Sequence, residues 1–284
     1  MARHPTDPMA DTQVDRGHEF AWTQGDFARI KDLIYRHAGI SLHEGKHAMV
    51  YSRISRRLRE TGHGSFKGYL DWLEQNDGPE WQEFVNALTT NLTSFFRENH
   101  HFVELARLVR ERGRDHDWKI WCAAASTGEE PYSIAITMAD ALGIEGRFQI
   151  WASDIDTKVL QTAARGVYKM DALKNVTQEQ LKRYFLKGKG KNDGLARIKP
   201  ELQRRLQFFS LNLIEDNWPL KESFDIVFCR NVMIYFDNVT QRQVLARIHR
   251  LMQPRSTLFV GHAENFSDAR QLFTLRGKTV YEKV

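Results

Sequence analysis

Beginning at Trp118, short apolar segments alternate with helical ones, and this alternation constrains the fold more than any other feature of the chain. Five segments are typical of buried strands, namely WKIWCAAAS, FQIWASDID, LQFFSLNL, FDIVFCRN and STLFVGHAE. Helical segments such as PYSIAITMADALG and TQRQVLARIHRLMQ lie between them, and the second is expected to stop at Pro254. Strands that alternate with helices predict an α/β fold with a mainly parallel sheet covered on both faces. The final segment, FTLRGKTVYEKV, predicts an antiparallel hairpin at the sheet edge.

The part of the chain before this alternation shows helical periodicity only. Apolar residues recur at helical spacing in DFARIKDLIYRHAG, KHAMVYSRISRRLRETG, SFKGYLDWLEQND and PEWQEFVNALTTN. A longer helix is expected from about Thr93 to Arg112. We therefore expect a flexible tail over residues 1–20, an all-helical domain over residues 21–91 and the α/β domain over residues 92–284. A basic insertion at about residues 167–205 interrupts the α/β domain.

Composition excludes several classes of protein. No apolar run is long enough to span a membrane, and the polar N-terminal segment lacks a signal-peptide core, so a cytoplasmic protein is expected. Cys122 and Cys229 lie in apolar runs and are expected to be buried core residues. The eleven histidines are scattered. Because the one adjacent pair, His100 and His101, is expected to point in different directions on a helix, no metal site is assigned.

The positive charge of the chain is concentrated in one region. The net charge is +5, yet residues 165–205 hold twelve Lys and Arg against four Asp and Glu, a net of +8. The rest of the chain is therefore slightly acidic. A local basic patch indicates a local anionic partner and argues against a general nucleic-acid coat.

The turn after the first predicted strand, AAASTGEEP, indicates the kind of ligand. Ligands of such sheets bind at the carboxyl ends of the strands, and a loop that binds a pyrophosphate there needs several glycines. This loop has one, Gly128, followed by two glutamates that would repel a phosphate at the helix N-terminus. A cofactor without phosphates and with a positive end fits better. S-adenosylmethionine has this character, because it carries a sulfonium and an ammonium group.

Two aspartates follow the second predicted strand. Asp154 ends that strand, where such folds bind ribose hydroxyls. Either Asp154 or Asp156 could instead only cap the next helix. Because Glu129 follows the preceding strand, we assign Asp154 to the cofactor and Asp156 to the cap.

Five longer motifs carry a family resemblance. They are NALTTNLTSFFRENHHF, AAASTGEEPYSIAI, ASDID, FDIVFCRNVMIYFD and GHAENF. Together they resemble the chemotaxis receptor glutamate methyltransferases, the CheR family, from about residue 20 to the C-terminus. The resemblance implies a helical N-terminal domain and a Rossmann-like catalytic domain with a small inserted β-subdomain. It also implies methyl transfer from S-adenosylmethionine to glutamate side chains of chemoreceptors, with S-adenosylhomocysteine as the product, by a cytoplasmic enzyme recruited to membrane receptor arrays.

The same resemblance assigns site residues. Family cofactor contacts map onto Asn91, Thr93, Arg97, Glu129, Asp154, Asn212, Leu213, Arg230 and Asn231. Methylation of a carboxylate needs no general base, because glutamate is already ionised near neutral pH. Alignment and removal of water remain as the enzyme's tasks. Arg97 offers a two-pronged donor that could orient the carboxylate, unless it is an ordinary surface arginine. Tyr235 is expected either as a second donor in the site or as a core residue.

Two surfaces are candidates for contact with the receptor. On the helix KHAMVYSRISRRLRE, the spacing predicts a buried stripe of Val50, Ile54 and Leu58 and places the arginines elsewhere. These arginines are Arg53, Arg56 and Arg57 on one flank and Arg59 further round. Such a run is usually a solvated face, but the resemblance implies that this helix meets the acidic methylation helices of the receptor.

The basic insertion is the second candidate surface. Two short strand-like pieces flank a glycine-rich turn, and an exposed hairpin edge can accept an added strand. Gly188, Gly190, Gly194 and Arg197 match family members that bind a short peptide at the receptor's C-terminus. A flexible, solvated loop is the alternative.

Two other functions stay open at this point. One is an S-adenosylmethionine-dependent RNA methyltransferase, which the basic charge allows, although no RNA-binding module is recognisable. The other is a non-catalytic module that binds cofactor and receptor. Neither a nucleic-acid partner nor membrane insertion is expected.

Overall fold

The computed structural model describes residues 19–266 and 269–284. The chain divides into two compact units, Met1–Leu88 and Thr89–Val284. Among the described residues, no helix combines the length and the apolar composition needed to cross a membrane.

The first unit is helical in its described part. Its helices are α1 (Gln24–Ala38), α2 (His47–Thr61), α3 (Phe66–Gln75) and α4 (Glu80–Leu88). Helix α1 begins with a capping box, in which Thr23 and Asp26 each accept a hydrogen bond from the other's backbone N–H. Val50, Ile54 and Leu58 of α2 are fully buried. The helical spacing of apolar residues in the sequence therefore identified the buried stripe of α2 correctly.

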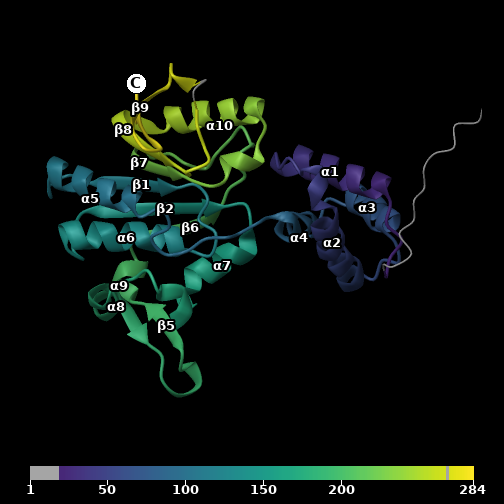
Figure 1. Cartoon of the computed structure of the whole chain (residues 1–284), viewed down its shortest axis with the longest axis horizontal. Coiled ribbons are helices and arrows are strands. Elements are labelled where there is room, and N and C mark those ends of the chain that lie inside the picture. The colour runs from purple at the N-terminus through teal and green to yellow at the C-terminus, as the bar shows by residue number, and fades with distance from the viewer. Residues whose placement is uncertain (1–18, 267–268) are drawn as a thin grey trace, which may run out of the picture. The chain divides into compact units, whose positions relative to one another are not determined.

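The second unit contains a seven-stranded sheet in the order β6-β2-β1-β7-β8-β10-β9 (Figure 1). Its strands are β1 (Trp118–Cys122), β2 (Phe148–Asp154), β6 (Leu206–Ser210), β7 (Phe224–Cys229), β8 (Met252–Val260), β9 (Phe273–Gly277) and β10 (Val280–Lys283). The strands from β6 to β8 are parallel, whereas β10 runs antiparallel to β8 and β9. The mainly parallel sheet with an antiparallel edge is therefore confirmed.

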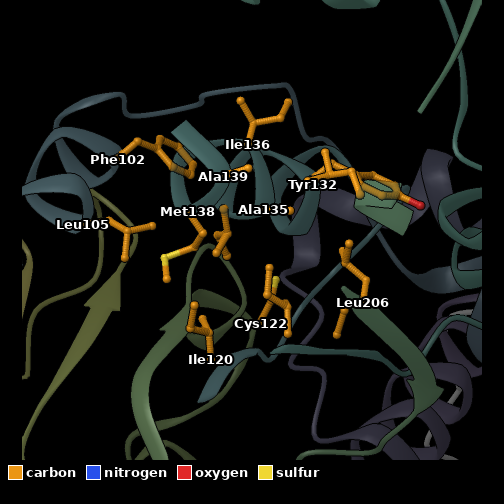
Figure 2. Close-up of a cluster of buried hydrophobic side chains, with 14 of the residues drawn as sticks. Phe102, Leu105, Ile120, Cys122, Tyr132, Ala135, Ile136, Met138, Ala139 and Leu206 are labelled. Atoms are coloured by element: carbon orange, nitrogen blue, oxygen red, sulfur yellow. The ribbon is translucent and has the colours of Figure 1, made fainter. Parts of the chain in front are cut away.

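Helices cover both faces of this sheet, with α10 on one side and α5 and α6 on the other (Figure 1). Their bounds are α5 (His100–Arg112), α6 (Glu129–Leu142) and α10 (Asn238–Arg250). Because successive strand residues point to opposite faces, Ile120 and Cys122 join one hydrophobic cluster and Trp121 joins the other. Figure 2 shows the first cluster, in which Leu105 of α5 and Met138 of α6 lie over β1.

Two boundaries differ from the sequence expectation. The helix expected from Thr93 begins only at His100, and Phe96 and Glu98 before it have positive φ values of 53° and 56°. Long-range contacts hold this loop: the Phe96 N–H donates to Ser133 Oγ at 2.9 Å. Helix α10 ends at Arg250 and not at Pro254, because Pro254 lies inside strand β8.

The insertion forms a small sheet of its own. Its strands are β3 (Val167–Lys169), β4 (Phe185–Lys187) and β5 (Leu195–Ile198), and two short helices accompany them, α8 (Gln178–Tyr184) and α9 (Pro200–Gln203). The order is β3-β5-β4 and both pairings are antiparallel. Strand β4 is therefore an outer strand, with one edge unpaired within this sheet. Helix α7 (Thr157–Arg165) connects β2 to the insertion.

Candidate functional site

The carboxyl ends of the parallel strands lie along one edge of the sheet, where such folds bind ligands. This arrangement gathers five segments that are far apart in the sequence. They are the turn after β1, Asp154 at the end of β2, Asn212 and Leu213 after β6, Arg230 and Asn231 after β7, and Gly261–Glu264 after β8. The irregular loop 91–99 joins them, because the Ser126 hydroxyl donates to the Asn91 carbonyl at 3.0 Å.

Asp154 is buried and already organises the turn after β1. Its carboxylate accepts hydrogen bonds from the backbone N–H of Ser126 at 2.8 Å and of Asp156 at 3.0 Å. Burial raises the pKa of Asp154 to about 6, although these backbone donors oppose the rise. A buried carboxylate at the end of the second strand suits the hydroxyls of a ribose.

Asp156 is the N-cap of α7, as predicted, and has a second role. One carboxylate oxygen accepts from the backbone N–H of Lys158 and Val159. The other accepts from the Thr89 hydroxyl at 2.7 Å and from the Asn91 side-chain amide at 2.8 Å. The amide of Asn91 is thus used to hold the loop in place, a contact that no local sequence pattern could indicate.

The acidic turn depends on its single glycine. Gly128 has a φ of 99°, and a Cβ at this position would lie 2.6 Å from the Tyr168 hydroxyl. Glu129 follows as the first residue of α6, is buried, and accepts a hydrogen bond from the Thr127 hydroxyl at 2.6 Å. Its negative charge stands where a phosphate-binding loop would present only N–H groups, which fits a cofactor with a cationic end.

Arg230 is the centre of a buried ionic network. Its side chain has no exposed surface and donates to Glu130 Oε2 at 2.6 Å and to the Arg97 carbonyl at 2.6 Å. The same guanidinium lies 3.2 Å from Glu98 Oε2. Burial raises the pKa of Glu130 despite the opposing charge of Arg230. The predicted cofactor residue Arg230 is thus buried at this edge, with its two terminal nitrogens bound to Glu130 and to the Arg97 carbonyl.

The other predicted residues lie close to this network or along the same edge. Asn231 has a φ of 57°, and its side-chain amide donates to Glu98 Oε1 at 3.4 Å. Tyr235 is half-buried in a 3₁₀ turn after β7. The half-buried Arg97 donates to the Leu92 carbonyl at 2.7 Å, and Thr93 lies in the same loop.

The segment after β6 is held by its own contacts. Asn212 Oδ1 accepts from the Ile214 N–H at 3.2 Å, and the carbonyl of the buried Leu213 accepts from Arg247 at 3.3 Å. Asn212 and Leu213 stand beside Asp154 in this region, because the Leu211 N–H donates to the Asp154 carbonyl at 3.0 Å.

The two adjacent histidines do not point apart as expected. The rings of His100 and His101 lie 4.1 Å apart, and their nitrogens approach the Glu98 carboxylate. His101 Nδ1 is 3.7 Å from Glu98 Oε2. Burial lowers the pKa of His101 to about 3, so this ring is neutral. The Arg230 guanidinium already supplies a positive charge to Glu98, and a divalent cation between these three residues would be repelled by it.

The arginines of α2 separate into two kinds. Arg57 is buried, donates to both oxygens of Glu80 at 2.9 and 2.6 Å, and also pairs with Glu60. The three arginines that the spacing places on one flank therefore differ in burial, because Glu80 of α4 lies opposite Arg57. Arg53 is half-buried and donates to the Ala87 carbonyl at 3.3 Å.

Arg56 and Arg59 form the exposed part of this run. Their side chains are 73% and 51% exposed and pair with Glu60 and Glu19 respectively. Surface ion pairs of this kind are weak and can be exchanged for a partner's carboxylates.

The glycines of the insertion shape the connection between β4 and β5. A Cβ on Gly188 would lie 1.9 Å from the Asn192 carbonyl oxygen, so this position requires glycine. Gly190 and Gly194 have positive φ values of 58° and 79°. Arg197 is exposed on β5, where it pairs with Leu186 of the outer strand β4.

Comparison with known proteins agrees with this geometry. Residues 25–89 match the family model described as CheR methyltransferase, all-alpha domain, and residues 91–282 match CheR methyltransferase, SAM binding domain. The chain is 52% identical to a chemotaxis protein methyltransferase of Salmonella typhimurium over 96% of both chains. It is 51% identical to one of Escherichia coli, covering 92% of this chain and 91% of the other. The chain therefore belongs to the CheR methyltransferase family, whose catalytic domain binds S-adenosylmethionine.

Proposed function

We propose that this protein transfers the methyl group of S-adenosylmethionine to glutamate carboxylates of chemoreceptors and forms glutamate methyl esters in chemotaxis adaptation. The observation that carries this proposal is the pairing of an acidic cofactor edge with Arg97. Asp154 and the turn at Glu129 suit a cationic cofactor, and Arg97 lies on the loop that packs against that turn. The names of the relatives, chemotaxis protein methyltransferases, support the receptor as the substrate.

The residues along the sheet edge divide the work of binding the cofactor. Asp154 accepts hydrogen bonds from ribose hydroxyls, and Glu129 supplies negative charge to the cationic end. The remaining cofactor contacts come from Asn91, Thr93, Asn212, Leu213, Asn231 and the main chain of Arg230. When bound, the cofactor supplies a methyl group activated by its sulfonium.

The substrate carboxylate needs orientation more than activation. It is ionised near neutral pH, so no general base is required. Arg97 offers a planar fork of donors that can hold both carboxylate oxygens, and this aligns one of them with the methyl group. Tyr235 closes the other side of the site. Because opposite charges cancel as the new bond forms, removal of water from the carboxylate is the main further contribution of the protein.

Cofactor affinity is expected to fall as the pH drops below about 6, the pKa of Asp154. The ionised carboxylate accepts hydrogen bonds from both ribose hydroxyls, whereas the protonated acid does so less well. Calorimetric titration of S-adenosylhomocysteine from about pH 5 to about pH 7.5 measures this. The control, Asp154→Asn, is expected to bind roughly tenfold more weakly and to lack the pH step. An affinity that is flat over this range in the wild-type protein would contradict the assignment.

Folding stability and cofactor affinity depend on the protonation of Asp154 in opposite directions, because the proton favours the folded state but weakens cofactor binding. The folded-state pKa of Asp154, about 6, lies above the ordinary aspartate value of 3.8, so the folded state holds the proton more tightly. This contribution to stability is therefore present at low pH and falls as the pH rises from about 4 to about 6.

Two surfaces are proposed for the receptor. Arg56 and Arg59, with Arg53 beside them, suit acidic methylation helices. The outer strand β4 suits a receptor tail added as a further strand, with Arg197 available for a carboxylate of that tail. A receptor bound in this way raises the local concentration of the enzyme near the methylation helices and recruits a cytoplasmic protein to receptor arrays.

Replacing Arg197 with Glu is expected to abolish binding of a C-terminal receptor peptide and to leave the affinity for S-adenosylhomocysteine unchanged. Gly194→Val is expected to act in the same way, because Gly194 has a positive φ that a β-branched residue adopts poorly. Calorimetric titration of both ligands measures the difference. Absence of peptide binding by the wild-type protein would refute the tether.

The function itself is tested by transfer of labelled methyl groups from S-adenosylmethionine. Membranes that contain the receptors are expected to acquire base-labile label, as methyl esters do, and cellular RNA is expected to acquire none. Label in RNA would favour an RNA methyltransferase. Binding of cofactor and receptor without any transfer would favour a non-catalytic module.

A further inference from the structure

We propose that Glu264 is a positioning residue that folds the segment after β7 into the shape required for cofactor binding. This inference rests on the proposed function, because Asn231 in that segment is a proposed cofactor residue. Glu264 itself belongs to none of the cofactor or substrate contacts assigned above. Its role follows from four hydrogen bonds, one strained residue and one glycine.

Glu264 is 4% exposed, and within residues 19–266 and 269–284 its carboxylate accepts hydrogen bonds from backbone groups alone. Oε2 accepts from the N–H of Gly261 at 2.5 Å and of Asn231 at 3.0 Å. Oε1 accepts from the N–H of Val232 at 3.0 Å and of Ile234 at 3.3 Å. One side chain from the segment after β8 thus binds three N–H groups of the segment that follows β7.

The segment that Glu264 holds is conformationally strained. Asn231 has a φ of 57°, a region that residues other than glycine rarely adopt and that persists only where the surroundings enforce it. The Asn231 N–H itself binds Glu264, and the next N–H, that of Val232, binds the same carboxylate. Glu264 is therefore in direct contact with the strained position, and the turn that carries Tyr235 follows immediately.

Gly261 shows how closely the two segments approach each other. A Cβ on this residue would lie 2.4 Å from Asn231 Nδ2, 2.8 Å from the Asn231 backbone nitrogen and 2.8 Å from Glu264 Oε2. The φ of Gly261 lies outside the left-handed region, so the close approach of its neighbours, and not a positive φ, disfavours a larger residue here. Gly261→Ala would therefore push Asn231 away from its position without removing any charge.

The four hydrogen bonds that Glu264 accepts form a clamp, and the orientation of the Asn231 side chain depends on it. Its side-chain amide reaches Glu98 at 3.4 Å, and the His262 N–H donates to the same Glu98 oxygen at 3.2 Å. Glu98 lies one residue after Arg97 in the loop proposed to hold the substrate carboxylate. Glu264 thus fixes one end of a chain of contacts that connects the segment after β7 to that loop.

The principal test is Glu264→Gln. Whichever way the glutamine amide turns, its NH₂ group faces two backbone N–H donors, so half of the clamp is lost without a change in size. We expect the affinity for S-adenosylhomocysteine to fall at least roughly tenfold and kcat to fall with it. Hydrogen exchange of the Asn231, Val232 and Ile234 amides is expected to become faster. Gly261→Ala is expected to reproduce the loss of affinity.

Asp225→Asn is the matched control. Asp225 is 5% exposed and lies near the start of β7, at the end remote from Asn231. It accepts a backbone hydrogen bond from Lys119 at 2.9 Å and is also bound by Arg112 and His116. Loss of the Asp225 carboxylate is expected to lower the Tm of the protein while leaving cofactor affinity within about twofold of the wild-type value. The comparison separates loss of stability in general from loss of loop shape.

The outcomes are distinguishable. Wild-type affinity in both Glu264→Gln and Gly261→Ala would overturn the positioning role, as would an affinity loss of equal size in Asp225→Asn. If Glu264→Gln does not fold, Gly261→Ala decides. Failure of the wild-type protein to bind S-adenosylhomocysteine would instead overturn the proposed function, and amide exchange would still show whether Glu264 holds the segment.

Discussion

Replacing Arg230 with methionine is expected to lower the free energy of unfolding by about 3–5 kcal/mol, because it leaves two carboxylates without their buried partner. The Arg230 side chain has no exposed surface, and Glu130 and Glu98 are 9% and 15% exposed. Methionine replaces the aliphatic part of the arginine side chain but not the guanidinium, so the loss combines the missing charge with some lost packing. Urea denaturation of the full chain measures the change.

The pH dependence and a second variant identify the cause of this loss. Burial already raises the pKa of Glu130 while Arg230 opposes the rise, so removal of Arg230 raises that pKa further. A raised folded-state pKa of an acid makes stability fall as pH rises, so the loss is expected to be larger at about pH 8 than at about pH 5. Arg230→Met combined with Glu130→Gln is expected to recover part of the loss, because only Glu98 then stays unpaired. A loss below about 1 kcal/mol would show that the network is not a buried charge pair in solution.

Replacing Arg97 with alanine is expected to lower kcat on the order of 100-fold and to change cofactor affinity much less. The Arg97 side chain is proposed to hold the attacking carboxylate, so its removal is expected to misalign that carboxylate with the methyl group. The hydrogen bond from Arg97 to the Leu92 carbonyl is exposed to solvent, so only a modest effect on the loop is expected. Rates of methyl transfer to receptor membranes, with calorimetric titration of S-adenosylhomocysteine, separate the two effects.

Two further variants test whether the loss of turnover is specific to the planar donor fork of Arg97. Arg97→Lys keeps the charge and loses the planar fork, so an intermediate rate is expected if orientation matters. Arg107→Ala removes an arginine of α5 that is 52% exposed and pairs with Glu104, and is expected to leave the rate unchanged. Equal losses of turnover and cofactor affinity in Arg97→Ala would make Arg97 a cofactor or structural residue only.

Much of the fold could be predicted because local contacts determine it. The periodicity of apolar residues identified the strands of the sheet, the antiparallel edge and the buried stripe of α2. The composition of one turn, with Gly128 and the glutamates after it, indicated a cationic cofactor. The cap at Asp156 was also predictable, since an N-cap binds N–H groups only two or three residues away.

The partners of the charged residues could not be predicted, because they come from segments far apart in the sequence. Arg57 is buried whereas its neighbour Arg56 is exposed, because Glu80, 23 residues away in the sequence, lies opposite Arg57. Arg230 binds Glu130 at a separation of 100 residues, and Glu264 binds Asn231 at a separation of 33. The loop before α5 was expected to be helical, yet contacts with Ser133 and Arg230 hold it in another shape. The sequence by itself determined most of the helices and strands and the acidic character of the turn after β1. Only the tertiary structure decided the shape of the loop before α5 and which charges are buried, because a buried charge requires a partner that folding brings to it.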